Sequence, residues 1–91
     1  MSQLQQISPD VNQDINVSKI GKKITYLRKS RGYTQAKLAE LIDVSIKTIS
    51  NWELGEKRLT LTHLLRLANL FDVSTDEILC RKAEDSVLSF Y

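Results

Sequence analysis

The sequence predicts an all-helical domain, and three observations support this prediction. Apolar residues recur at helical spacing, as in Ile20, Ile24 and Leu27, which fall at positions i, i+4 and i+7. Runs of this kind are separated by residues typical of helix ends, such as Gly32 and Gly55. No segment alternates apolar and polar residues as a strand does. With 91 residues and a hydrophobic fraction of 42%, the chain has room for one small domain.

Start and stop signals divide the chain after residue 17 into five predicted helices. The first covers about residues 19–31 and ends before Gly32. A threonine or serine precedes each of the other four, as N-cap residues commonly do, and Ser74 with Glu77 has the form of a capping box. These four helices are predicted over residues 35–41, 46–54, 61–71 and 75–81, after the caps Thr34, Ser45, Thr60 and Ser74.

Two terminal segments flank the predicted domain of residues 18–81. Residues 1–17 show no sustained periodicity and are predicted to form a flexible N-terminal arm. Residues 82–91 form a C-terminal tail, which is helical if the last helix continues, and no internal repeat is evident along the chain. Leu79, Ala83, Val87 and Phe90 would then form an apolar stripe along one helix and offer a contact for a homodimer. The alternative is that the tail folds back on its own core or is disordered. The full set of dimer candidates is Leu79, Ala83, Val87, Leu88, Phe90 and Tyr91.

The net charge of +2 is unevenly distributed along the chain. Residues 1–17 contain no basic and two acidic residues, for a net charge of −2. Residues 18–59 contain ten basic and four acidic residues, for a net charge of +6. Residues 60–91 contain three basic and five acidic residues, for a net charge of −2. This asymmetry indicates a polyanionic partner or, alternatively, a solvated charge-rich helix surface.

Several classes of protein are excluded by the composition. One cysteine, Cys80, and one histidine, His63, cannot form an internal disulfide or a Cys/His metal site, so no metal is expected. Cys80 is expected to be buried as a small apolar residue. No run approaches the roughly 20 apolar residues of a membrane span and no secretory signal is visible, so a cytoplasmic location is expected. His63 has no nucleophile near it in the sequence and no glycine-rich phosphate loop is present, so neither an enzyme nor a cofactor is expected.

The second and third predicted helices are joined by too few residues to lie antiparallel, so they must cross steeply at a tight turn. Such a crossing needs a small residue where the helices approach, and Ala39 supplies it. Asp43 stands where the turn needs a residue that tolerates left-handed backbone, and Val44 and Ile49 are apolar residues that lock the helices together. This spacing over residues 35–54 is that of the helix-turn-helix, whose second helix enters the major groove of DNA.

Residues 20–79 resemble the Cro and phage-repressor type of helix-turn-helix regulators, also called Xre-like. The matching stretches are IGKKITYLRKSRGYTQAKLAELI, VSIKTISNWELG and LLRLANLFDVSTDEIL. The resemblance implies a compact five-helix fold like that of the lambda repressor. It also implies a sequence-specific DNA-binding regulator of transcription, a repressor that acts as a homodimer on a two-fold symmetric operator of double-stranded DNA.

The resemblance further implies that exposed side chains of the third helix, the recognition helix, read bases. Their chemistry suits this role, because Lys47 can donate to guanine, Asn51 can pair with adenine and Ile46 can cover a thymine methyl group. The alternative is an ordinary polar helix face. The full set of predicted base-reading residues is Ser45, Ile46, Lys47, Ser50 and Asn51.

Phosphate contacts are expected at the start of the second helix and in the loop after the third. A helix N-terminus favours a phosphate through its free N–H groups and dipole, and the family uses the glutamine at the position of Gln35 as a backbone clamp. The alternative for each candidate is a helix cap or a solvated charge. The candidates are Thr34, Gln35, Lys37, Lys57 and Arg58.

Arg28 and Glu53 resemble the family's paired charges, which implies a structural ion pair between the first and third helices. Trp52 is expected to pack beside this pair rather than stack on bases. The chain departs from the family's pattern at Asp43 and Asp72, where relatives usually carry glycine. It departs again at Leu59, where many carry proline.

An antitoxin is the alternative function, because this fold also occurs in proteins that bind a toxin protein and autoregulate their own promoter. The N-terminal arm and the C-terminal tail are then the expected toxin-binding segments.

Overall fold

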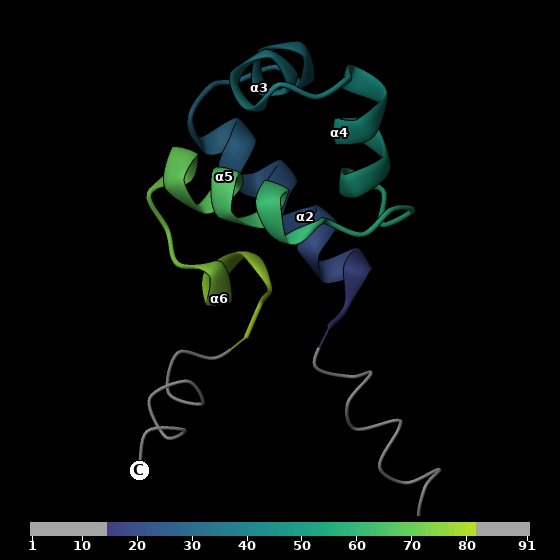
Figure 1. Ribbon diagram of the computed structural model, residues 1–91, viewed down its shortest axis with the longest axis vertical. Coiled ribbons are helices and arrows are strands. Elements are labelled where there is room, and N and C mark those ends of the chain that lie inside the picture. Colours follow the sequence, from purple (N-terminus) through teal and green to yellow (C-terminus); the bar gives the residue numbers. More distant parts are fainter. Residues whose placement is uncertain (1–14, 82–91) are drawn as a thin grey trace, which may run out of the picture.

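A computed structural model describes residues 15–81, and within that range the chain forms five helices and no strand. In Figure 1, α3 and α4 lie at one end of the molecule, α6 lies at the other, and α2 and α5 pack between them. The predicted all-helical architecture is confirmed. None of the helices described is long and apolar enough to cross a membrane. Their bounds are α2 Val17–Ser30, α3 Gln35–Ile42, α4 Ile46–Glu53, α5 Leu61–Phe71 and α6 Thr75–Ile78.

The residue before each helix is an N-cap, and its side chain accepts a hydrogen bond from the N–H group three residues later. This bond satisfies one free donor of the first turn. In α3, α4, α5 and α6 this residue is the predicted one, at Thr34, Ser45, Thr60 and Ser74. In α2 the cap is Asn16, so this helix starts two residues before the predicted position. Its first residue therefore falls inside the predicted N-terminal arm, of which residues 1–14 lie outside the described range.

The same short sequence makes two of the turns between helices. Residues 39–45 read AELIDVS and residues 68–74 read ANLFDVS, so five of the seven positions are identical. Asp43 and Asp72 both adopt the left-handed conformation, with φ of 60° and 55°. In each copy the N–H of the following valine donates to the carbonyl oxygen of the alanine at 3.0 Å. The shared stretch is therefore a single turn of seven residues and not a repeated domain.

Helix α6 ends earlier than predicted. It stops at Ile78, and Cys80 has a φ of 61°, which breaks the helical path. The predicted helix to residue 81, and the continuous stripe that would begin at Leu79, are therefore wrong. Leu79 is instead half-buried against the core. Cys80 is exposed rather than buried, and its Sγ lies 3.5 Å from the carbonyl oxygen of Lys19. The other predicted dimer candidates lie outside the described range: Ala83, Val87, Leu88, Phe90 and Tyr91.

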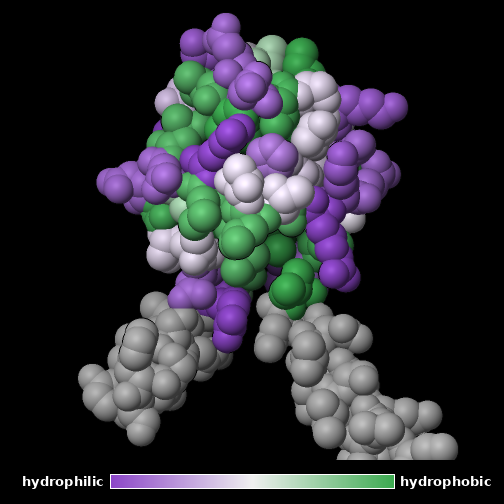
Figure 2. All heavy atoms as spheres, in the orientation of Figure 1, coloured by the Kyte–Doolittle hydropathy of each residue, from purple (hydrophilic) through white to green (hydrophobic). Residues whose placement is uncertain are grey.

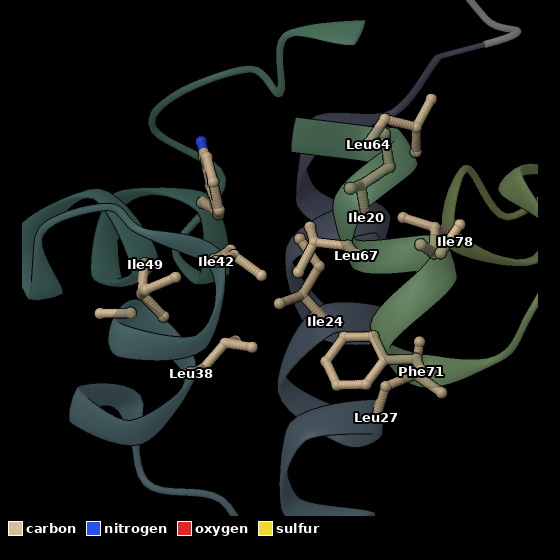
Figure 3. Close-up of a cluster of buried hydrophobic side chains, with 13 residues drawn as sticks. Ile20, Ile24, Leu27, Leu38, Ile42, Ile49, Leu64, Leu67, Phe71 and Ile78 are labelled. Carbon is tan, nitrogen blue, oxygen red and sulfur yellow. The ribbon is translucent and has the colours of Figure 1, made fainter. Parts of the chain in front are cut away.

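One hydrophobic core joins all five helices (Figure 3). In that view the side chains from α3 and α4 point toward those of α2 and α5. Six large side chains are fully buried, and burying each contributes about 1.5–3 kcal/mol to stability. They are Ile24, Leu38, Ile49, Leu67, Phe71 and Ile78.

Candidate DNA interface

Helix α4 has one flank in the core and the other in solvent. Ile49 and Trp52 are only 0% and 2% exposed, whereas Ile46 is 52% exposed. Turning the helix would bring the two buried side chains into water, at a cost of several kcal/mol on the scale of about 1.5–3 kcal/mol for each. The core therefore determines which flank of α4 faces outward.

The polar side chains on the outer flank have no partners within residues 15–81. Lys47 is exposed, Ser50 and Asn51 are half-buried, and none of the three side chains hydrogen-bonds or pairs with another described residue. Ser45 differs, because its hydroxyl caps α4 and lies 2.9 Å from the hydroxyl of Thr48. The structure thus places the predicted residues on or beside one helix flank, with three polar side chains free to contact a ligand. Base reading by them stays a prediction.

A buried ion pair fixes the C-terminal end of α4 to α2. Arg28 Nε lies 2.6 Å from Glu53 Oε2, and Arg28 Nη2 donates to Glu53 Oε1 at 3.1 Å. The third nitrogen of the guanidinium, Nη1, donates to the carbonyl oxygen of Tyr33 at 2.9 Å. The two charged side chains are only 10% and 7% exposed. This two-point contact sets the position of Glu53 more strictly than a single bond would.

Gln35 adds a third helix to this contact. Its Nε2 donates to Glu53 Oε1 at 2.9 Å, which links the first residue of α3 to the last residue of α4. Burial by itself raises the pKa of the Glu53 carboxyl, but the hydrogen bonds from Arg28 and Gln35 outweigh it and hold that pKa below its usual value. Glu53 is therefore the residue at which α2, α3 and α4 meet. The observed contact of Gln35 is with Glu53, and its predicted contact with phosphate stays a prediction.

Gly21 allows α2 to lie directly against the end of α4. A Cβ atom at this position would lie 2.4 Å from the carbonyl oxygen of Trp52 and 2.6 Å from that of Glu53. Any other residue here would push the two helices apart. This role of Gly21 was not predicted, although an isolated glycine inside a helical pattern signals a close approach.

The predicted phosphate-binding residues fall into two groups. Thr34 caps α3, and Lys37 Nζ lies 3.1 Å from Glu40, so both already have a partner in the domain. Lys57 and Arg58 are exposed in the loop between α4 and α5 and form no ion pair within residues 15–81. These two cations are therefore the described candidates whose charge is fully available to an external anion.

A contact at the turn between α3 and α4 was not foreseen from the sequence. Arg66, on α5, donates through Nη1 to the carbonyl oxygen of Ile42 at 3.2 Å. This bond satisfies a carbonyl at the C-terminus of α3 and ties the turn to α5. It joins residues 24 apart, so no local pattern could indicate it.

Trp52 packs inside the domain, as expected. Its ring lies 5.2 Å from the half-buried His63 ring, centroid to centroid, which places His63 at the edge of the core. Because the indole is buried, it is not available to stack on nucleic-acid bases.

The sequence profile of the helix-turn-helix family matches residues 24–78, more than half of the chain. The chain belongs to this family. It is 37% identical over 60 residues to the HTH-type transcriptional regulator ImmR of Bacillus subtilis, which covers 66% of this chain and 47% of ImmR. It is 33% identical over 67 residues to the phage CTXphi transcriptional repressor RstR of Vibrio cholerae, which covers 74% of this chain and 60% of RstR. The chain thus spans about half the length of these relatives.

Solved structures share the fold. The restriction-modification controller protein C.AhdI of Aeromonas hydrophila superimposes with a TM-score of 0.64 at 27% identity, over 68% of this chain and 94% of that protein. Hydroxypropylphosphonic acid epoxidase of S. wedmorenis gives a TM-score of 0.66 at 27% identity, over 72% of this chain but only 35% of the enzyme. The resemblance expected from the sequence is therefore confirmed, and the fold also occurs as a minor part of a larger enzyme.

Proposed function

We propose that this protein is a sequence-specific DNA-binding regulator of transcription that places α4 in the major groove. One observation supports this most directly: α4 is held by its buried flank while Lys47, Ser50 and Asn51 on its outer flank have no partner in the described domain. A rigid helix with unpaired polar side chains is what direct reading of base edges requires. The names of ImmR, RstR and C.AhdI, a regulator, a repressor and a controller protein, agree with this function.

Selection of bound sequences from random DNA duplexes tests the proposal, and a two-fold symmetric consensus is the expected result. Asn51→Ala should relax the preference at one position of each half-site, at a cost of about 1–3 kcal/mol for the cognate base pair. Asn69→Ala is the matched control, because Asn69 is an exposed asparagine on α5. Equal affinity for every duplex, or an unchanged consensus for Asn51→Ala, would contradict the proposal.

The two free cations give a second test. Lys57→Ala and Arg58→Ala should each weaken binding to all duplexes alike and reduce the dependence of affinity on salt, because a phosphate contact releases counterions. Lys22→Ala is the control, since Lys22 is exposed on α2. A change of base preference in the Lys57 variant would mean that this residue does not contact phosphate alone.

We further propose that the protein binds as a homodimer and represses by occupying its operator. Two recognition helices then address half-sites about 34 Å apart. Since α6 stops at Ile78, the contact cannot run along one helix into the tail, and Leu65 is a better candidate because it is 48% exposed on α5. Sedimentation should show a dimer that Leu65→Asp disrupts and Thr62→Asp, on the same helix, does not. A wild-type monomer both with and without DNA would refute the dimer.

The alternative function is toxin binding, for which the N-terminal arm and the C-terminal tail were the expected contact segments. Almost all of these residues lie outside the described range, so toxin binding stays a prediction. The expectation that the protein is not an enzyme and works in the cytoplasm stays a prediction, in keeping with the proposed regulatory role.

A further inference from the structure

An apolar groove of about 290 Å³ lies at the end of the domain opposite α3 and the start of α4. We call it the basal groove, and it is formed by the start of α2, the loop before α5, the first turns of α5 and the residue after α6. Hydrophobic residues gather over α5 and toward this end of the molecule in Figure 2. Two residues of its lining are strongly exposed for apolar side chains, Ile15 at 48% and Leu61 at 72%. Its other apolar residues include Ile20, Trp52, Leu64 and Leu79.

Trp52 provides a second observation at this groove, because it belongs to the lining. The indole is 2% exposed, and its Nε1–H group is buried without a hydrogen-bond acceptor among residues 15–81. A buried donor without an acceptor is costly, by about 1–3 kcal/mol. The chemistry of the groove therefore calls for an apolar segment that also carries a hydrogen-bond acceptor, and a peptide backbone supplies both.

The rim of the groove is positively charged. Lys57 and Arg58 both belong to the lining, are exposed, and form no ion pair within the described domain. An occupant with carboxylates beside its apolar residues would therefore complement the groove better than an uncharged one.

The ten residues that follow Arg81 have this composition. After Lys82 and Ala83 come the two carboxylates Glu84 and Asp85, and two aliphatic and two aromatic residues follow within the next six positions, in the sequence SVLSFY. The chain leaves the described domain two residues after Leu79, which is itself part of the groove wall. Ten extended residues reach up to about 33–36 Å, so the segment is long enough to cross a groove of this size. By contrast, residues 1–14 contain no aromatic residue, and polar residues separate their few aliphatic ones.

We propose that residues 84–91 of the same chain dock in the basal groove. Val87, Leu88 and Phe90 then cover its apolar lining, Glu84 and Asp85 lie beside Lys57 and Arg58, and a backbone carbonyl of the segment accepts the Nε1–H of Trp52. The docked segment also occupies the two free cations predicted to contact phosphate, so it competes with DNA of any sequence. Only this competition depends on the proposed function, and the docking itself does not.

Trp52 is the only tryptophan of the chain, so its indole N–H gives a single NMR signal that reports on the groove. In the full chain with Leu88→Ser and Phe90→Ser, that signal should shift and its hydrogen should exchange faster with solvent. The matched control, Leu4→Ser with Ile7→Ser in the N-terminal segment, should leave it unchanged. Amide signals of α2 and α3 serve to show that each variant is folded.

Three results would overturn the docking. The indole signal could be the same in the tail variant and the wild type, which would mean that the tail is not near Trp52. It could move only in the N-terminal control, which would assign the groove to residues 1–14. It could depend on protein concentration in the wild type, which would assign the groove to a second copy.

The charge contact has its own test. The double variant Glu84→Lys with Asp85→Lys should loosen the docked segment, and the Trp52 indole signal should report this. Combining it with Lys57→Glu and Arg58→Glu reverses both charges and should restore the wild-type indole signal. Absence of this rescue would remove the charged part of the proposal. The tail variant should also bind random duplexes more tightly at low salt than the wild type. If it does not, while the indole signal responds as expected, the docking stands and the competition with DNA fails.

Discussion

Replacing Arg28 should destabilise the domain before it alters which DNA sequence is bound. Arg28→Ala removes three hydrogen bonds, two to Glu53 and one to the carbonyl oxygen of Tyr33. It also leaves the Glu53 carboxylate, only 7% exposed, without its counter-charge. Removing one partner of a buried pair typically costs about 3–5 kcal/mol. The whole stability of a small domain is about 5–15 kcal/mol, so this loss brings the protein close to unfolding.

Urea unfolding of the full chain measures this loss, and two further variants make the result interpretable. Arg28→Lys keeps the charge but not the two-point geometry, so it should lose about 1–3 kcal/mol and remain folded enough for DNA selection. Lys29→Ala, an exposed neighbour, should change stability by less than about 0.5 kcal/mol. Native stability in Arg28→Ala, or a changed base preference in Arg28→Lys, would refute the structural role of this pair.

Three other predictions follow from single features of the fold. Asp43→Gly should relieve left-handed strain and stabilise by about 0.5–1 kcal/mol, raising the melting temperature by about 2–8 °C. Asp72→Gly should give a shift of the same sign because the turn is the same, and opposite signs would contradict the strain argument. Gly21→Ala should destabilise by about 1–3 kcal/mol or more in chemical unfolding, because its Cβ would overlap the backbone of α4; an unchanged midpoint would show that the helices separate freely. The lowered pKa of Glu53 contributes stability at pH values above the unfolded value of about 4.3. That contribution is lost as the pH falls through the folded value, so Glu53→Gln should flatten the acid limb of a stability curve, and an equally steep limb would contradict this.

Features that depend on neighbouring residues could be predicted from the sequence, whereas those that depend on the angle between helices could not. The caps Thr34 and Ser45 were predictable because a hydroxyl binds an N–H only three residues away. The contact of Gln35 with Glu53 spans 18 residues and exists only because α3 and α4 cross steeply, so no local pattern reveals it. The end of α6 was missed for a different reason. Its left-handed residue is Cys80, which carries none of the signals that a glycine at a helix end provides.

The repeated turn also bears on the order in which the domain can assemble. Each copy closes through bonds between residues three to five apart, whereas Arg28 and Glu53 are separated by 25 positions. Closing a short loop costs less chain entropy than closing a long one, so both turns are inexpensive to form early and the ion pair is a late contact. We therefore expect changes in the turns to slow refolding and changes in the ion pair mainly to speed unfolding, a division that stopped-flow kinetics would reveal or contradict. The turn around Asp43 would then set the orientation of α4 early in folding. The later ion pair between Arg28 and Glu53 would hold α4 in that orientation.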